Sequence, residues 1–589
     1  MTDPLREPGF LTEHQLRAVN AKGDIFLVAC PGSGKTRAGG VRFARLTDEG
    51  RRVAATSYTN VGVEQIRDVV SGQLGMTVAP TSFVGTLHQF LLRYVFYPFG
   101  HLAMRCGTGP RLIADERGWD DVVFGGDRRI RAPVSRFHFR PDGTLCFRGE
   151  LPKGVRSREE AATSEHEQAL RMKRRYAAAG YASLDDSMYW SLEVLRQHPA
   201  VARAVAGRFD ELQVDEGQDT SELQLACLHA LCSTGRLGSL VLVGDIEQSI
   251  FSFQGASPEG CRALAEARGL ETIELAENHR SSQRICDVAV HFCARDVPDR
   301  AVGEAAECPW VPELILYDPA RPEDAVARFR ERLGEFHIDE GDAAVLARAN
   351  ALVDELNGQQ PPVRCEPRPL SLGRAAAAIR GAATLSRRQV DAVDRVLAYT
   401  AWDAADLSEL EMDQRQAVRR ASMAVLRAAP GLEGDLREWI RSTAGALATA
   451  VSGLTDTSAH KAGQALRSSA DQEGVLAAAA FTLPPQALRA QTVHDLKGES
   501  RDAVLVVADR QRSRGRGAQG AIWSRPLLGE AVPAEDAEEL RIAFVALTRA
   551  RRYCAVALPA DTESVITDAF DDTGFITARA IRAAPNDAA

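Results

Sequence analysis

An apolar segment that runs directly into a glycine-rich turn constrains the fold of this chain more than any other feature. The segment Asp24–Cys30 (DIFLVAC) is predicted to be a buried strand, and PGSGKT follows it up to Thr36, where a helical pattern begins. Gly32 and Gly34 let backbone N–H groups curl around phosphate oxygens, and a helix N-terminus adds its dipole. This order predicts an α/β domain with a parallel sheet that binds a nucleotide.

The polar residues of this loop are candidate ligands for phosphate and metal. Lys35 is expected to reach the β- and γ-phosphates, Thr36 to bind Mg²⁺, and Ser33 to lie in the cradle between the two glycines. Ala29 stands where such loops usually begin with glycine. A chance occurrence of the string is the alternative reading, and the loop alone indicates a nucleotide without specifying a reaction.

Acidic and amide side chains follow two further predicted strands. LQVDEGQDT places Asp215 and Glu216 directly after the strand Phe209–Val214, and VGDIEQSI places Gln248 after the next strand. The carboxyl ends of parallel strands meet at one edge of a sheet. Asp215 is therefore a candidate Mg²⁺ ligand, Glu216 a candidate base for the attacking water, and Gln248 a candidate γ-phosphate sensor. An acidic turn at a strand end is the alternative for each segment taken alone.

Two long segments interrupt the strand–helix alternation. The turn-rich residues Gly107–Pro110 open the first, which carries a hairpin signal around Pro141–Gly143 and then a charged helix over Arg158–Ala179. From about 367 to 480 the chain is rich in Ala, Leu and Arg with helical periodicity and no strand signal. These segments predict a basic insertion over 109–176 and an all-helical insertion over 367–484.

Composition bounds the class of protein. The 589 residues suggest several domains, and the eleven Cys include no CxxC pair, which argues against a disulfide scaffold or a zinc ribbon and fits a reducing cytoplasm. The sequence shows neither a signal-peptide core nor a transmembrane stretch, so we expect no membrane partner. The net charge of -9 argues against a nucleic-acid binder.

One local segment opposes that last inference. Arg128–Arg158 holds nine basic and two acidic residues, a formal balance of +7, with Phe137, Phe139 and Phe147 interleaved. A basic hairpin with aromatic residues suits phosphate contact and base stacking, and a solvated insertion with a small aromatic core is an equally good reading. The arginines Arg510–Arg516 in a Gly-containing loop are better explained as a solvated charged loop.

The order of strings resembles superfamily 1 helicases of the UvrD/Rep group, from Leu11 to about Ala557 apart from the two insertions. The matching strings, in chain order, are LTEHQLRAV, GSGKTR, SYTNVGVEQI, GTLHQF, VDEGQDT, GDIEQSIFSFQGA, LAENHRSS, ARAN, QTVHDLKGES and EELRIAFVALTRAR. The resemblance implies an α/β fold of two RecA-like P-loop NTPase domains that clamp ATP between them. The predicted division is 1–108 and 177–268 for the first domain, with 269–366 and 485–589 for the second domain and its tail.

The resemblance also implies roles for individual residues. Gln15 would read the adenine, Arg37 and His279 would lie against the base, Glu499 would meet the ribose, and Arg280 and Arg549 would stabilise charge at the γ-phosphate. The positions implied for DNA contact are Tyr58, Thr59, Asn60, Thr86, His88, Phe253, Thr492 and His494.

Several positions depart from the pattern of that family. Gln254 stands where an arginine is usual, His279 where tyrosine usually stacks on adenine, and Phe253 where tryptophan is usual. Val61 replaces a lysine, and Glu499 is displaced by one position from the usual acidic residue. Slower hydrolysis and a changed base preference are the expected consequences.

The expected function is an ATP-dependent DNA helicase or single-stranded DNA translocase with 3′-to-5′ polarity, using ATP and Mg²⁺ on single-stranded or tailed DNA. The alternative is a helicase-like ATP- and DNA-sensing subunit that controls a separate nuclease, similar to the helicase-like subunit of the Gabija anti-phage system. Repair and antiviral defence are both open as pathways. About forty residues follow the last motif, too few for a fused nuclease domain.

Overall fold

The computed structural model describes residues 11–113, 119–125, 131–149, 151–152, 155–250, 255–295, 297–357, 367–380, 387–402, 407, 410, 412–455, 459–467, 474–481, 488–509, 519–560 and 573–580. Its contacts divide the chain into two units. The first comprises 1–114, 120–356 and 488–589, and the second comprises 115–119 and 357–487. None of the described helices has the length and continuous hydropathy that a bilayer crossing requires.

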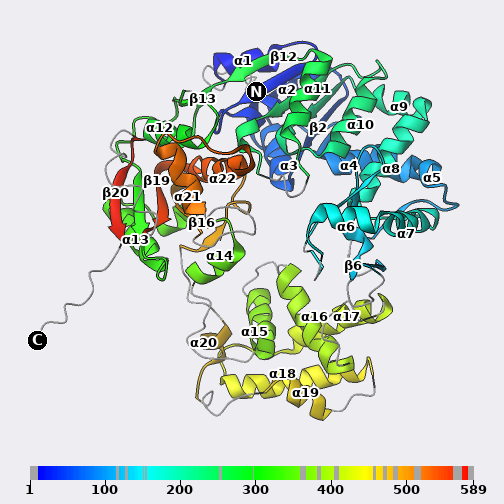
Figure 1. Ribbon diagram of the computed structural model, residues 1–589, viewed down its shortest axis with the longest axis vertical. Helices are drawn as coiled ribbons and strands as arrows, with labels where there is room; N and C mark the ends of the chain where they lie inside the picture. Colours follow the sequence, from blue (N-terminus) through cyan, green and yellow to red (C-terminus); the bar gives the residue numbers. More distant parts are fainter. Residues whose placement is uncertain are drawn as a thin grey trace, which may run out of the picture. The chain divides into compact units, whose positions relative to one another are not determined.

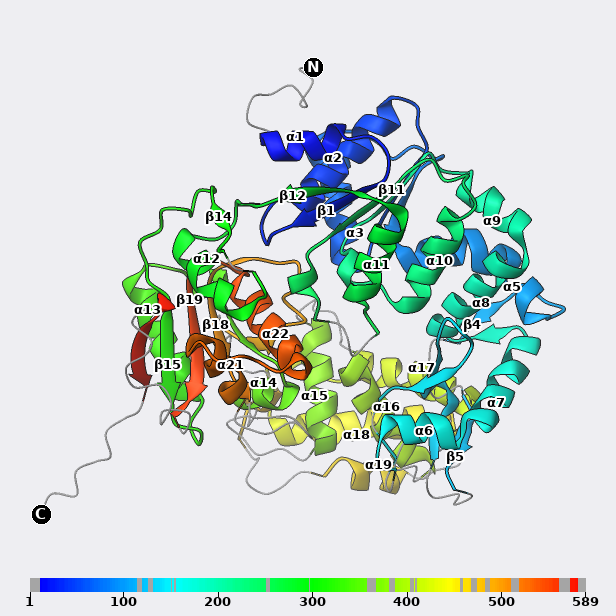
Figure 2. The same ribbon diagram turned by 45° about the horizontal axis from the view of Figure 1, so that its top comes forward.

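The first unit contains two parallel six-stranded sheets, drawn in blue to green and in green to red in Figures 1 and 2. The first sheet has the order β12 (Glu271–Leu275), β1 (Ile25–Ala29), β11 (Leu240–Gly244), β10 (Glu211–Val214), β2 (Val53–Ser57) and β3 (Phe83–Thr86). Its central strands are apolar and buried on both faces, as a sheet covered by crossover helices requires. The predicted α/β class with parallel sheets is confirmed.

The first sheet ends later in the sequence than predicted. Strand β12 lies in the range assigned to the second domain, yet it pairs in register with β1, from Ile25 opposite Glu271 to Ala29 opposite Leu275. The predicted boundary after residue 268 is therefore wrong by one strand. The reason is topological, because a strand adds to whichever sheet edge its preceding crossover helix reaches, and the strand's own residues do not encode that edge.

The helices of the same domain are α1 (Glu13–Asn20), α2 (Lys35–Asp48), α3 (Asn60–Arg67), α10 (Glu222–Cys232) and α11 (Pro258–Arg268). The first insertion adds a hairpin of β7 (Phe137–Phe139) and β8 (Leu145–Phe147), then α6 (Arg158–Ser164) and α7 (His166–Ala178). After it, α8 (Leu184–Gln197) and α9 (Pro199–Ala206) lead back to β10. The helix predicted over 158–179 is divided at Glu165, whose φ and ψ of -111° and 15° leave the helical region.

The second sheet has the order β17 (Ala490–Thr492), β16 (Ala343–Ala347), β18 (Arg501–Val507), β19 (Ala550–Pro559), β15 (Glu313–Tyr317) and β20 (Ile576–Ala580). It packs with α12 (Gln283–Ala289), α13 (Glu323–Glu335), α14 (Asn350–Leu356), α21 (Gln519–Leu527) and α22 (Ala537–Leu547). One of its apolar clusters includes Ile250, which follows the first sheet in the chain. The two sheets therefore share buried contacts.

The second unit is helical where it is described. Its helices are α15 (Pro367–Arg380), α16 (Arg387–Trp402), α17 (Met412–Ala428), α18 (Leu436–Ser452), α19 (Ala459–Ala465) and α20 (Ala477–Phe481). They enclose an apolar core of their own, in which Trp439 meets Phe481 with ring centroids 4.5 Å apart.

A buried ion pair ties α2 to the first sheet. The Arg42 guanidinium donates to both carboxylate oxygens of Glu211 at 2.8 and 2.6 Å, and each side chain is 3% exposed. We expect Arg42→Leu to lower the free energy of unfolding by roughly 3–5 kcal/mol, because it leaves Glu211 buried without a charge partner. Urea unfolding would measure this. Arg17→Gln, which removes the exposed pair between Arg17 and Glu271, should cost less than about 1 kcal/mol. Equal losses of unfolding free energy in Arg42→Leu and Arg17→Gln would contradict the stabilising role of the buried Arg42–Glu211 pair.

Candidate nucleotide-binding site

The glycine-rich turn between β1 and α2 has a backbone that only glycine can adopt readily at two positions. Gly32 and Gly34 have φ of 72° and 74°, in the left-handed region. A Cβ on Gly34 would clash with Gln15 Nε2, and that Nε2 donates to the Ser33 carbonyl at 2.8 Å. The Ser33 Oγ is buried and has no hydrogen-bond partner within the described structure. The turn is thus a preformed polar cradle in front of the α2 N-terminus.

The loop's lysine and threonine lie against the acidic residues that follow β10. The Lys35 Nζ lies 2.9 Å from the Glu216 carboxylate, and the Thr36 hydroxyl donates to Asp215 Oδ2 at 3.1 Å. Glu216 has a φ of 54°, which turns the chain sharply at the strand end. These four residues, predicted from separate segments, form one cluster.

The two adjacent carboxyl groups differ in acidity. Burial, followed by repulsion from Glu216, raises the pKa of Asp215 to about 6. Burial also opposes ionisation of Glu216, but the Lys35 and Lys497 ammonium groups overcome it and lower the pKa of Glu216 to about 2. Glu216 is therefore a firmly ionised partner of Lys35 in this state.

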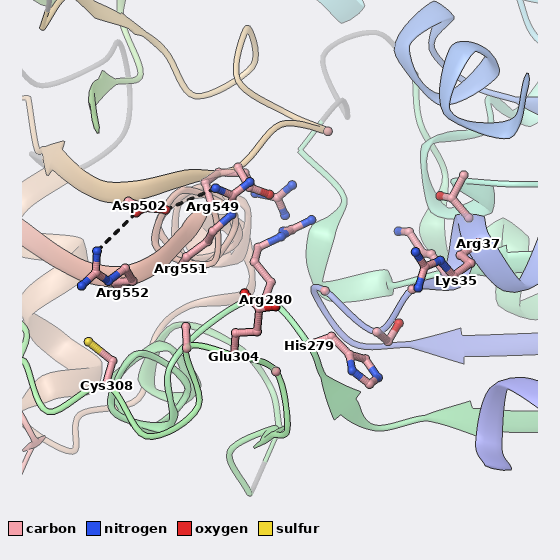
Figure 3. Close-up of a pocket in the computed structure, with 18 of the residues that line it drawn as sticks. Lys35, Arg37, His279, Arg280, Glu304, Cys308, Asp502, Arg549, Arg551 and Arg552 are labelled. Carbon is pink, nitrogen blue, oxygen red and sulfur yellow. Dashed lines mark hydrogen bonds and ion pairs between the residues drawn. The ribbon is translucent and has the colours of Figure 1, made fainter. Parts of the chain in front are cut away.

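Two arginines beside the second sheet, Arg280 before α12 and Arg549 before β19, lie across from Lys35 in Figure 3. Arg280 donates to the Thr548 carbonyl at 3.0 Å, and Arg549 donates to Gln248 Oε1 at 3.1 Å. Burial, followed by repulsion from neighbouring arginines, lowers the pKa of Arg280 to about 9, and burial lowers the pKa of Arg549 to about 10. Desolvated cations that repel each other favour an anion between them.

A lysine without a predicted role completes the cluster. Lys497 donates from Nζ to Asp219 Oδ2 at 2.5 Å and to the Gln248 carbonyl at 2.8 Å. Its side chain is 5% exposed and that of Asp219 is 0% exposed. Lys497 lies in the motif QTVHDLKGES and Asp219 in VDEGQDT. A comparison of opposite charges between these two motifs could therefore have paired them.

Most of the predicted nucleotide-binding residues line one cavity of about 1140 Å³. The candidate nucleotide residues that line it are Gly32, Ser33, Gly34, Lys35, Thr36, Arg37, Glu216, Gln248, His279, Arg280 and Arg549. In Figure 3, Lys35 and Arg37 lie on one side, and Arg280 and Arg549 lie on the other. Gln15 and Asp215 stand behind the lining and contact it through Ser33 and Thr36.

His279 and Glu499 differ in their relation to the cavity. His279 lines it, and its backbone N–H donates to the Gly32 carbonyl at 3.0 Å. Burial lowers the pKa of its imidazole, so the ring is neutral at pH 7 and suited to stacking. Glu499 instead accepts a bond from Arg501 at 2.7 Å and is absent from the lining, although Gly498 and Ser500 belong to it. The structure therefore does not bring Glu499 to the place implied for it.

Two candidate DNA-binding residues line a second cavity of about 680 Å³, where the inserted hairpin meets the first sheet. Tyr58 and His88 form part of its wall, together with Arg140 and Arg148 of the hairpin and Arg158. His88 Nδ1 lies 2.9 Å from Gln224 Nε2, and burial lowers the pKa of this imidazole. Polar and apolar side chains both line this cavity, and its arginines come from the basic segment Arg128–Arg158.

The other candidate DNA residues are engaged locally. The Thr59 and Thr86 hydroxyls cap α3 and α4 (Leu87–Leu91), and Asn60 is the exposed first residue of α3. Thr492 donates to Asp495 at 2.6 Å, and His494 Nε2 lies 3.2 Å from the Ile250 carbonyl. Phe253 and Gln254 lie outside the described residues, as do Arg128, Arg129 and the loop Arg510–Arg516.

The aromatic residues of the hairpin form a core. Phe137, Phe139 and Phe147 are at most 3% exposed. Phe137 and Phe147 meet edge to face at 5.2 Å, and Phe139 stacks on Tyr189 at 4.0 Å. Of the two readings that the sequence left open, the structure therefore favours the local core. The hairpin offers its arginines, rather than exposed rings, to a ligand.

Known proteins resemble the chain along these same segments. The UvrD/REP helicase N-terminal domain family matches residues 11–108 and 148–267. An ATP-dependent DNA helicase PcrA of Leuconostoc citreum is 23% identical over 360 residues, 58% of this chain and 47% of the relative. An ATP-dependent DNA helicase UvrD1 of Mycobacterium leprae is 24% identical over 373 residues, with the same coverage. A shorter stretch of 128 residues is 36% identical to one subunit of an ATP-dependent helicase/nuclease of Levilactobacillus brevis and covers 20% of this chain and 10% of that protein.

The matched range of the family contains the glycine-rich turn, the acidic pair after β10 and Gln248, while Arg280 and Arg549 lie beyond it. The chain spans about half the length of these PcrA and UvrD1 relatives. The family match, the ordered motifs and the pair of parallel sheets make the chain similar to the UvrD/Rep helicases of superfamily 1.

Proposed function

We propose that the chain hydrolyses ATP between its two RecA-like domains and uses the cycle to move along single-stranded DNA with 3′-to-5′ polarity. One observation carries the proposal. A glycine-rich turn and Glu216 of the first domain share a cavity with Arg280 and Arg549 of the second, and Asp215 contacts this lining through Thr36. Cations from a second domain placed opposite a phosphate cradle suit the charge that develops during phosphoryl transfer.

The residues present fit ATP and Mg²⁺. The cavity offers the buried Ser33 Oγ, which lacks a partner within the described structure, and the helix N-terminus beside it. Thr36 and Asp215 supply adjacent hard oxygen atoms, the ligands that Mg²⁺ prefers. When bound there, Mg²⁺ would neutralise charge on the phosphate oxygens.

The chain's own residues would divide the work between them. Lys35 would give up its bond to Glu216 and bind phosphate oxygens, since Lys35 and Glu216 both line the cavity. Release from Lys35 would raise the pKa of Glu216 from its low value and let the carboxylate accept a proton from water. Arg280 and Arg549 would stabilise the developing charge, with Arg549 placed by its bond to Gln248.

The second cavity supports single-stranded DNA as the partner. Arg140, Arg148 and Arg158 stand around it, and the net charge of the segment that supplies them is positive although the whole chain carries -9. Phosphate contact depends on local rather than total charge. Tyr58 and His88 offer rings at the same cavity, which suits a strand whose bases are unstacked.

A second candidate function is control of a separate nuclease, in anti-phage defence or repair, with little unwinding by the chain itself. The local similarity to one subunit of an ATP-dependent helicase/nuclease favours it. A sensing protein of this kind would hydrolyse ATP on DNA without separating strands. The cytoplasm is the expected location for either function.

Lys35→Ala should reduce the ATPase rate measured with single-stranded DNA by about 100-fold or more, because it removes a cation from the transition state. A coupled assay for ADP release would measure the rate. Lys22→Ala, which changes an exposed lysine of the same domain, is the matched control and should keep the parent rate. A Lys35→Ala protein with the parent rate would refute the assignment of the site.

Arg148→Gln should weaken single-stranded DNA binding and lower the slope of log K against log salt by about 0.7, the loss of one phosphate contact. Fluorescence anisotropy at several salt concentrations would give both quantities. Arg171→Gln changes an arginine of α7 whose side chain is 71% exposed, outside the cavity lining, and should leave the slope unchanged. An unchanged slope in Arg148→Gln would place the DNA elsewhere.

Unwinding assays on tailed duplexes separate the two candidate functions and test polarity. A 3′-to-5′ motor should unwind a duplex with a 3′ single-stranded tail and leave a 5′-tailed duplex intact. ATP hydrolysis without unwinding of either substrate would favour the regulatory function. Preference for the 5′ tail would contradict the proposed polarity.

A further inference from the structure

The segment that follows β11, from Asp245 to Ile250, is held mainly by residues of the other domain. Ile250 is 0% exposed and lies in the apolar cluster of the second sheet. The Gln248 side chain accepts from Arg549, and its carbonyl accepts from Lys497. The Ala294 N–H donates to Glu247 Oε2 at 3.2 Å. The segment belongs to the first domain by sequence and is bonded there to Gln218, and these contacts also attach it to the second domain.

One arginine of the second domain, without a predicted role, lies at the start of this segment. Arg295 follows α12, a helix whose Ile285, Val288 and Ala289 belong to the second apolar cluster. Its Nη2 donates to Asp245 Oδ1 at 2.7 Å, and its Nη1 donates to Asp299 at 2.6 Å. The Arg295 side chain is 24% exposed and that of Asp245 is 2% exposed. The bond is thus a shielded ion pair between the two domains.

A continuous chain of hydrogen bonds connects this ion pair to the nucleotide cavity. Asp245 accepts from Arg295 on Oδ1, and its Oδ2 accepts from Gln248 Nε2 at 2.8 Å. Gln248 Oε1 then accepts from Arg549 Nη2 at 3.1 Å. Because an amide has one donor end and one acceptor end, the bond to Asp245 fixes which end of Gln248 faces Arg549. The carboxylate is in turn oriented by Arg295 and by the Glu247 N–H, which donates to the same Oδ1 at 3.1 Å.

We propose that Arg295 is a positioning residue of the ATPase site, which acts through Asp245 to hold the Gln248 amide and the Arg549 guanidinium in register. This inference rests on the proposed ATP hydrolysis at the cavity. Arg295 is outside the lining of the cavity, and its bonds go to Asp245 and Asp299, so its effect is exerted through Asp245. The second bond of Arg295, to Asp299, anchors it within its own domain.

The proposal separates turnover from nucleotide binding. The turn, Lys35 and Thr36 keep their geometry without Arg295, so affinity for ATP is retained. The groups that meet the developing charge lose their orientation, and a small displacement of such groups costs about 10- to 100-fold in rate. Loss of Asp299 removes the anchor and leaves the bond to Asp245, so it should affect turnover far less.

The test compares Arg295→Met, Arg295→Lys and Asp299→Asn with the parent protein and Lys35→Ala. We expect Arg295→Met to lower kcat for DNA-stimulated ATP hydrolysis about 10-fold or more, with the KM and the equilibrium Kd for ATP within about 3-fold of the parent. Arg295→Lys restores the charge and should recover part of kcat. Asp299→Asn should keep at least about half of the parent kcat. Urea unfolding of each variant checks that the fold is retained.

Hydrogen–deuterium exchange gives a readout that needs no turnover. Amides of residues 245–250 should exchange faster in Arg295→Met than in the parent or in Asp299→Asn, while those of the glycine-rich turn stay unchanged. The proposal is overturned if Arg295→Met keeps the parent kcat, if its Kd for ATP weakens in step with kcat, or if Asp299→Asn loses as much. A parent protein as inactive as Lys35→Ala would refute the proposed function instead, and the exchange result would then decide the inference about Arg295 independently.

Discussion

Charge pairing across the cleft is the interaction on which the rest of the site depends. Lys497 meets Asp219, and Arg295 meets Asp245, each pair joining the second domain to the first. Such charges are stable away from water only while their partners stay in place, because an unpaired buried charge costs several kcal/mol. Any relative movement of the domains that breaks one pair must therefore supply a new partner. Water that enters between the domains, or the phosphates of a nucleotide, can be that new partner. Domain movement therefore depends on what the cavity contains.

The same pairing explains why residues after β11 behave as part of the second domain. Ile250 packs among apolar residues of the second sheet, while Gln248 is held by Lys497 and Arg549. The segment is thus attached to the first domain at Gly244 and through Gln218, and to the second domain through Gln248 and Ile250. It also leads towards Gly255 and Ala256, which line the second cavity beside Tyr58.

The sequence predicted most of the site because its motifs lie at strand ends. Lys35, Thr36, Asp215 and Glu216 meet as expected, since parallel strands bring their carboxyl ends to one edge. Arg295 could not be predicted, because a lone arginine after a helix has no periodicity or spacing that reveals its partner. The hairpin rings were ambiguous for a related reason. Alternation shows that Phe137 and Phe139 share a face, and only the packing of the whole insertion decides whether that face is covered.

The bond between Lys35 and Glu216 bears on when hydrolysis would become possible. While Lys35 remains bonded to Glu216, the carboxylate is held well below the pKa that a general base needs near neutrality. Phosphate oxygens compete for the same ammonium group and would leave Glu216 with Lys497, whose own nearest bonds go to Asp219 and Gln248. The basicity of Glu216 then rises only after a nucleotide has occupied the cradle. In the proposed mechanism, the Lys35–Glu216 ion pair would therefore also prevent the base from acting before its substrate is bound.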